Sequence, residues 1–384
     1  MKFGIMNLFP VGDGTSDHQV LRETLDEIQL ADELGFDSIW LAEHHFSKYG
    51  ILGSPMNFGM AVAERTKRIT IGTAVLVLPL HHPLRLAEDI AALDVLSGGR
   101  VSIGVGRGYQ PAEFAGFGIP LEESKIRYQE TLEILRLALS QENFSYHGQI
   151  FHYDNVTTYP RPYTPGGPPI LQGTVSPDSF RERGAVGESI ITSPNFTPLG
   201  IMQKNFSLYR QSMQENGFDI SAYDLPFMQQ VWCGDSEAGL REAAQAAMNY
   251  YKSVGKVIPG SEEAMEKERA YYAAVAKNIE LLTLEQTLTH GGNFGSAQQV
   301  IETIEMLREQ LGINHYIGWL RIPSLDRRTA LKSMEEFAEK VIPHFRATDQ
   351  RTGTAVDTGT TVDSGTVDAR DDRVTVPVAE AVVG

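Results

Sequence analysis

The chain has 384 residues, of which 42% are hydrophobic, and it carries a formal net charge of −16 with a pI near 5.1. So acidic a chain repels phosphate at long range, which excludes a general affinity for nucleic acid or for an anionic membrane surface. The single cysteine, Cys233, excludes an intramolecular disulfide, and without an apolar leader or a run of 18 apolar residues we expect a cytoplasmic protein with no transmembrane helix.

Strand-like segments alternate with helical patterns along most of the chain. The expected strands are residues 3–8, 37–42, 69–78, 100–106, 168–173, 188–192, 226–233 and 314–320. Helical spacing or capping signals mark residues 17–34, 55–65, 83–96, 120–140, 176 onward, 197–216, 236–251, 296–311 and 326–344, and residues 143–165 resemble hairpin material. Eight strand–helix units predict an α/β protein with a closed (β/α)8 barrel, the TIM barrel.

An open, doubly wound parallel sheet is the alternative to the barrel. The segment 69–78 is a nearly continuous apolar run, which suits a parallel strand covered on both faces in either fold. No G-x-G-x-x-G motif opens the first strand–helix turn, and this weakens the doubly wound alternative.

Two segments depart from the strand–helix pattern. Residues 255–295, after the seventh strand, hold a charged helical stretch at 261–281 and then a glycine-rich loop. These residues fit no simple strand–helix unit. Residues 347–384 have no aromatic residue and repeat Thr, Val, Asp and Gly, which predicts a disordered acidic tail after a barrel domain at 1–346.

The sequence Glu43-His44-His45 follows the second strand, where barrel enzymes gather their active-site residues. Adjacent residues of an extended chain face opposite ways, so the two imidazoles do not easily share a metal ion, and no further ligand spacing accompanies them. Histidine suits general acid–base work near neutral pH. A hydrogen-bonded structural pair is the equal alternative.

Two other strand ends carry groups that suit an anion. Arg107 with Gly108 closes the fourth strand, where a guanidinium fork can bind a phosphate or pair with a carboxylate of the protein. Thr174 and Ser176 precede a helix, where free N–H groups can bind an anion or Ser176 can simply cap the helix. A further pair, His81-His82 before Pro83, is expected to be structural.

Several stretches together resemble the bacterial luciferase-like flavin-dependent monooxygenase family, and its luciferase catalytic subunits in particular. The resemblance rests on LADELGFDSIWLAEHHFSKYGILGSP (30–55), IGTAVLVLPLHHPLRLAEDIAALDVLSGGR (71–100), GVGRGYQPAEFAGFG (104–118) and GNFGSAQQVIETIEML (292–307). It covers about residues 1–345 and excludes the tail.

The resemblance implies a barrel that binds reduced FMN at the carboxyl ends of its strands, with the flavin supplied by a separate flavin reductase. Reduced flavin and dioxygen would form a C4a-peroxyflavin that oxidises a small, largely apolar organic substrate, for which an aldehyde is one candidate. The family also implies a homodimer formed through the helices after strands two and three. Residues 255–295 occupy the place of the family's mobile active-site loop, so we favour a mobile lid there over a disordered surface insertion. The alternatives are a deazaflavin-dependent hydride-transfer oxidoreductase of the same superfamily and a non-catalytic flavin-binding protein.

The resemblance also assigns roles to single residues. His44 matches the family's catalytic histidine, and Arg107 matches the arginine that binds the flavin phosphate. The remaining cofactor-binding candidates are Ser176 and Thr174 at the phosphate, Gly108, and Ala74 and Val75, whose bond matches a non-prolyl cis peptide beside the isoalloxazine. The substrate-pocket candidates are His45, as a wall residue, Tyr109 and Phe9, with Trp319 as a further aromatic at the barrel mouth.

The sequence departs from luciferase at two positions near the flavin. Gly106 stands where luciferase has a reactive cysteine, and Gln172-Gly173 stands where luciferase has an acid–serine pair. The expected flavin pocket therefore differs from that of luciferase in detail, and light emission is not expected.

Overall fold

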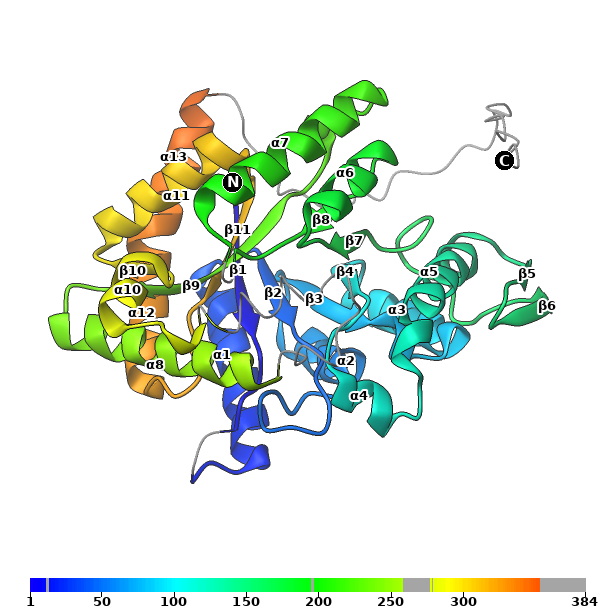
Figure 1. The fold of residues 1–384 in the computed structure, drawn as a ribbon, viewed down its shortest axis with the longest axis horizontal. Coiled ribbons are helices and arrows are strands. Elements are labelled where there is room, and N and C mark those ends of the chain that lie inside the picture. The colour runs from blue at the N-terminus through cyan, green and yellow to red at the C-terminus, as the bar shows by residue number, and fades with distance from the viewer. Residues whose placement is uncertain (12–13, 195–196, 258–276, 278, 353–384) are drawn as a thin grey trace.

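The structure is a computed structural model, and it describes residues 1–11, 14–194, 197–257, 277 and 279–352. Within these residues no helix is both long enough and apolar enough to cross a membrane. Helices surround one parallel sheet, and a short hairpin projects at one side of the molecule (Figure 1).

All eight expected strands are present in this sheet. They are β1 (Lys2–Asn7), β2 (Ser38–Leu41), β3 (Thr70–Val77), β4 (Val101–Gly106), β7 (Ile170–Gly173), β8 (Ile190–Ile191), β9 (Pro226–Cys233) and β11 (His315–Trp319). With β10 (Asn293–Gly295) they form a nine-stranded sheet in the order β10-β9-β11-β1-β2-β3-β4-β7-β8, in which every pair is parallel. Thr192, after β8, forms a parallel bridge with Phe227 in β9, so the sheet curls back on itself and the fold is TIM-barrel-like.

The helices follow the strands as the sequence predicts. They are α1 (Asp17–Leu34), α2 (Pro55–Arg65), α3 (Pro83–Ser97), α5 (Ser124–Ser140), α6 (Pro177–Ala185), α7 (Leu199–Glu215), α8 (Glu237–Val257), α11 (Ala297–Leu311), α12 (Arg327–Glu336) and α13 (Ile342–Thr352). The caps explain the bounds: the Ser16 side chain accepts the N–H of Gln19 at the start of α1, and Gly35, at φ 94°, ends it. The hairpin is β5 (Phe144–His147) with β6 (His152–Val156).

Three elements differ from the sequence expectation. A short helix, α4 (Pro111–Gly116), follows β4 and was not predicted. The end of the expected 255–295 insertion is not a simple loop, because it forms α10 (Leu284–His290) and then β10, which pairs with β9. Residues 258–276 and 278, the centre of the expected lid, lie outside the described residues.

The last helix continues to Thr352, beyond the expected start of the tail at 347. Asp349 explains this, because its side chain is only 7% exposed and pairs with the amino group of Met1 and with Arg308 at 2.8 Å. A buried carboxylate with two cationic partners holds this turn in place although its local composition already resembles the tail. The rest of the expected tail, from residue 353 on, lies outside the described residues.

Two apolar layers form the core. The outer layer lies between the strands and the helices, and the inner layer fills the curled sheet. Trp40 from β2 belongs to the inner layer, and its indole lies over Gly72 of β3, where an added Cβ would come within 2.5 Å of the ring. Glycine at 72 is therefore required by the close approach of this side chain.

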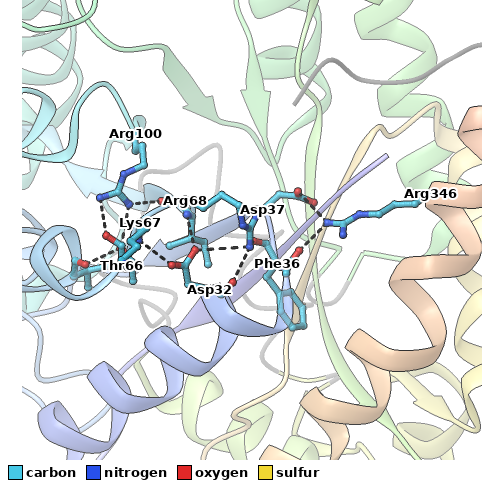
Figure 2. Close-up of polar contacts among 11 residues, drawn as sticks. Asp32, Phe36, Asp37, Thr66, Lys67, Arg68, Arg100 and Arg346 are labelled. Carbon is cyan, nitrogen blue, oxygen red and sulfur yellow. Dashed lines mark hydrogen bonds and ion pairs between the residues drawn. The ribbon is translucent and has the colours of Figure 1, made fainter. Parts of the chain in front are cut away.

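A polar network ties the helix ends to the strand starts at the amino-terminal end of the sheet, and Figure 2 shows its members. Asp32, near the end of α1, accepts the N–H of Lys67 at 2.9 Å. Arg100 donates to carbonyl oxygens between positions 63 and 69, and Arg346 on α13 reaches Asp37 at 3.3 Å. These contacts fix the loops opposite the candidate active site, and in a barrel that face serves stability.

A buried polar chain closes the amino-terminal end of the inner layer. The Asp224 carboxylate accepts the Nδ1–H of His315 at 3.0 Å, and the other ring nitrogen of His315 lies 2.7 Å from the hydroxyl of Ser38. The indole N–H of Trp40 donates to the same hydroxyl at 2.9 Å. Burial would raise the pKa of Asp224, but the charge and hydrogen bond of His315, with Lys2 nearby, lower it to about 2.

The lowered pKa of Asp224 makes the stability of the fold depend on pH. We expect Asp224→Asn to lower the free energy of unfolding by about 1 kcal/mol at neutral pH, a modest value because the carboxylate keeps some solvent contact. The difference in the free energy of unfolding between Asp224→Asn and the native chain is fully present above the ordinary aspartate pKa of 3.8, and it is lost as pH falls through about 2. Urea unfolding at a series of pH values measures it.

Asp154→Asn is the matched control. Asp154 pairs with His147 at 3.1 Å on the β5–β6 hairpin, but the two side chains are 75% and 61% exposed, so this pair contributes little. Equal effects of the two substitutions would contradict a stabilising role of the buried pair.

Candidate active site

Most of the predicted site residues lie at the carboxyl ends of four neighbouring strands. His44 and His45 follow β2, Ala74 and Val75 lie in β3, Arg107 to Tyr109 follow β4, and Gly173 to Ser176 end β7 and lead into α6. The strand order β2-β3-β4-β7 makes these ends adjacent. Ala74 and Val75 remain partly exposed although Thr73 and Leu76 beside them are fully buried, so this part of the sheet is open to solvent.

Glu43 holds this end of the sheet together. Strand β3 runs on past the end of β2, and the Glu43 carboxylate accepts the N–H of Val77 at 2.8 Å in place of a strand partner. The same carboxylate accepts Nε2–H of His45 at 2.9 Å and Nε2–H of His81 at 2.8 Å. Burial would raise the pKa of Glu43, but the charge of His81 and the hydrogen bonds from His81, His45 and the backbone lower it to about 2.

The two adjacent imidazoles have different partners, as the alternation of side chains predicts. His45 turns to Glu43 and packs edge-on against Phe117, with ring centroids 4.8 Å apart. The Nδ1 atom of His44 lies 3.1 Å from a carboxylate oxygen of Glu113 and 3.0 Å from the amide nitrogen of Gln110. His45 therefore belongs to a structural cluster, whereas His44 belongs to a separate polar group on α4 and the turn before it.

A group of three hydrogen-bonded tyrosines begins at the ring of His44. The Tyr49 ring meets the His44 ring edge-on at 4.7 Å, and its hydroxyl is 2.5 Å from that of Tyr250 on α8. The Tyr109 side chain forms a hydrogen bond with that of Tyr49. The Tyr250 ring packs edge-on against the Trp319 ring, with centroids 4.6 Å apart. Burial raises the pKa of Tyr49, Tyr109 and Tyr250 well above the ordinary value, so the hydroxyls stay neutral and act as hydrogen-bond donors and acceptors.

The remaining predicted residues differ in where they lie. Ser176 caps α6 and exchanges hydrogen bonds with Ser179, so the capping alternative is present in the structure. The expected cis peptide joins Ala74 and Val75. Phe9 was expected in the substrate pocket, but it is 1% exposed and packs in the outer layer against Phe58, with centroids 4.9 Å apart.

Strand alternation explains the position of Phe9. Ile5 of β1 lies in the outer layer and Leu8 lies in the inner layer, so Phe9 keeps the outer side that the alternation gives it. Sequence reasoning also missed Tyr49, Gln110, Glu113 and Tyr250. The only local signal was the position of Gln110 and Glu113 just after the Arg107 motif.

Parallel strands curl into a TIM-barrel-like sheet, with histidine after β2 and arginine after β4 on either side of β3, and this is the arrangement of a barrel enzyme. The chain belongs to the luciferase-like monooxygenase family, whose model matches residues 1–315.

Relatives of this chain are flavin-dependent monooxygenases. The oxygenase component of flavin-dependent trigonelline monooxygenase from Acinetobacter baylyi is 24% identical over 92% of this chain and 99% of its own length. The crystal structure of monooxygenase RslO1 from Streptomyces bottropensis has a TM-score of 0.77 and 28% identity, and covers 90% of this chain and all of its own.

Two more distant structures share the fold but use different cofactors. The oxygenating constituent of 3,6-diketocamphane monooxygenase from Pseudomonas putida, in complex with FMN, has a TM-score of 0.74 and 20% identity over 89% of this chain and 98% of its own. An F420-dependent secondary alcohol dehydrogenase has a TM-score of 0.70 and 19% identity over the same shares. The fold alone therefore does not identify the flavin.

The Glu43 cluster predicts a large effect of a small substitution. We expect Glu43→Gln to lower the free energy of unfolding by about 2–4 kcal/mol, because an amide cannot accept all three buried N–H groups and leaves the His81 charge without its partner. Urea unfolding measures the loss. Glu64→Gln, at an exposed position of α2, is the control with the same change of charge.

The pH dependence of this loss follows from the two pKa shifts. Burial would lower the pKa of His81, but Glu43 raises it. The charged His81 therefore contributes fully to the free energy of unfolding below its ordinary pKa of 6.5, and this contribution is lost as pH rises further. The contribution of Glu43 is full above its ordinary value of 4.5 and is lost toward pH 2. The difference between Glu43→Gln and the native chain should therefore be largest between those two values, and a difference that grows steadily above pH 7 would contradict the charged pair.

Proposed function

We propose that this protein is the oxygenating component of a two-component monooxygenase that uses reduced FMN and dioxygen. The observation that carries the proposal is the position of His44. It stands at the solvent-open carboxyl end of the sheet, with Nδ1 held by Glu113, and the strands that follow bring Val75 and Arg107 to the same end.

The residues at this end fit a flavin mononucleotide. Gly106 and Gly173 lie against the Val75 side chain, where an added Cβ would come within 2.5 Å and 3.2 Å of it, so Val75 extends an apolar surface over β4 and β7. Such a surface suits the ring system of a flavin. Arg107 and the first turn of α6, a nine-residue helix capped by Ser176, would hold the phosphate, and Gly108 and Thr174 lie beside them.

Bound reduced FMN would supply the electrons that activate dioxygen. His44 would hold or move a proton at Nε2, next to the reacting group. The Tyr49 and Tyr250 hydroxyls, with Trp319 behind them, would exclude water from the inner end of the site and orient the substrate. Tyr109 and His45 would form part of the pocket wall.

The wider parts of the proposal follow the same family pattern. The relative from Acinetobacter is named an oxygenase component, which supports a separate flavin reductase as the source of reduced FMN for this chain. The substrate would be a small, largely apolar organic molecule, for which an aldehyde is one candidate. We further propose a closed eight-stranded barrel, a homodimer formed through α2 and α3, a lid within 255–295 and a cytoplasmic location.

The first test supplies the protein with FMN, a flavin reductase, NADH and labelled dioxygen, with decanal as the substrate probe. We expect one labelled oxygen atom in the carboxylic acid product. His44→Ala should lower product formation by about 100-fold or more, because it removes the acid–base group, while the dissociation constant for FMN changes less than about threefold. His147→Ala, on the exposed hairpin, is the control.

Three outcomes would decide against parts of this proposal. Hydride exchange with a deazaflavin, without any oxidation in the presence of FMN, would replace it by the F420-dependent alternative. Tight FMN binding without oxygen transfer to decanal would remove the aldehyde. Equal loss of FMN binding and turnover in His44→Ala would make His44 a structural residue.

A second test concerns the phosphate. Arg107→Ala should raise the dissociation constant for FMN by about 10- to 100-fold and change that for riboflavin by less than about threefold, because charge-assisted hydrogen bonds to the phosphate are lost and the ring contacts remain. Isothermal titration with each flavin measures both constants. Arg85→Ala, on the exposed face of α3, is the control, and equal weakening of FMN and riboflavin would contradict a phosphate role.

A further inference from the structure

Glu113 makes an unusual double contact behind the candidate catalytic histidine. One of its oxygens, Oε1, lies 3.1 Å from Nδ1 of His44 and 3.0 Å from the backbone nitrogen of His45. Its side chain is only 2% exposed, whereas that of His44 is 12% exposed. A buried carboxylate thus accepts hydrogen bonds from two successive residues, which fixes the ring of His44 and the backbone at His45.

Other contacts also restrict His44. The backbone N–H of His44 donates to the carbonyl of Leu52 at 3.2 Å. Gly50 lies so close to the His44 ring that an added Cβ would come within 3.2 Å of Cδ2. Tyr49 packs edge-on against the ring. Within the described part of the chain, both hydrogen-bond partners of the ring are at Nδ1, and Nε2 has none.

Gln110 and Glu113 make opposite demands on the Nδ1 atom of His44, and the charge of Glu113 decides which one is met. Its amide nitrogen lies 3.0 Å from the same Nδ1 atom, yet a ring nitrogen cannot donate to Glu113 and accept from Gln110 at once. An Nδ1 lone pair 3.1 Å from a carboxylate oxygen would be repulsive, whereas an Nδ1–H at that distance forms a charge-assisted hydrogen bond. The orientation of a Gln amide is assigned from its neighbours, so Gln110 turns its oxygen toward the ring.

We propose that Glu113 is a positioning residue that holds His44 in the Nδ1–H tautomer, so that Nε2 is the atom that accepts and returns a proton. The same carboxylate stabilises the imidazolium formed when Nε2 takes up a proton, as the carboxylate of a catalytic triad does for its histidine. The tautomer follows from the geometry alone, and its effect on turnover rests on the proposed monooxygenase function.

Nuclear magnetic resonance of the full chain, labelled with 15N at histidine, tests the tautomer without flavin or substrate. Two-bond 1H–15N correlations distinguish Nδ1–H from Nε2–H, and His44→Ala identifies the His44 signals. We expect Nδ1–H in the native chain and a mixture of both tautomers in Glu113→Gln, because a neutral amide no longer favours a proton at Nδ1. Glu113→Ala should populate Nε2–H still further.

Two other variants serve as controls. Gln110→Leu should keep His44 as Nδ1–H, and Glu122→Gln, an exposed position close to α4 in the sequence, should leave the signals unchanged. Nε2–H in the native chain, or no change in either Glu113 variant, would overturn the proposal. A changed tautomer in Gln110→Leu but not in the Glu113 variants would transfer the role to Gln110.

Turnover gives the second readout. Glu113→Gln should lower kcat by about 10- to 100-fold with little change in FMN affinity, and should cause less than about a twofold further loss in the His44→Ala background, because the two groups act as a unit. An equal loss in both backgrounds would make Glu113 a general structural residue. If the tautomer is as expected but no flavin supports turnover, the positioning role stands and the monooxygenase function fails.

Discussion

The buried carboxylate of Glu43 is the contact on which the open end of the sheet depends. It accepts the N–H of Val77, which has no strand partner on that side because β3 is longer than β2. The same two oxygens accept hydrogen bonds from His45 and His81. A buried charge is tolerated only when its hydrogen-bonding capacity is filled, and here three donors fill it. The partly exposed segment of β3 and the loop that carries His44 therefore share one rigid support.

Each of the two adjacent histidine rings thus has its own carboxylate partner, Glu43 for His45 and Glu113 for His44. Glu43 is enclosed, and its partners leave no solvent-open atom on the carboxylate, so its role is to hold strands and loops. Glu113 reaches the same loop from α4 and contacts the His44 ring at Nδ1, so that within the described residues Nε2 of this ring has no hydrogen-bond partner. The difference between a structural and a chemically available imidazole comes from which side of the chain each carboxylate occupies, and this follows from the alternation of His44 and His45.

The sequence predicted the elements that depend on local pattern. Strand bounds, helix caps and the placement of His44, Ala74, Arg107 and Ser176 at one end follow from apolar runs and from the parallel strand order. Phe9 lies in the outer layer because the alternation along β1 continues through it, whereas the expectation of a pocket residue rested only on its position after the first strand. Glu113, Tyr250 and the last turn of α13 depend on partners far away in the sequence, and no local pattern encodes such contacts.

The short helix α4 joins the two halves of the proposed site. Arg107, the proposed phosphate ligand, lies at the end of β4, and Gln110 and Glu113 follow within the next turn of chain and contact His44. An anion at Arg107 and the orientation of His44 are therefore linked through one continuous backbone segment. The net charge of −16 does not prevent this, because a buried or partly buried local cation acts at short range, where the field of distant surface carboxylates is screened by salt. A chain that repels phosphate as a whole can thus bind one phosphate at the proposed site at a single strand end, and the same segment holds the proposed catalytic base.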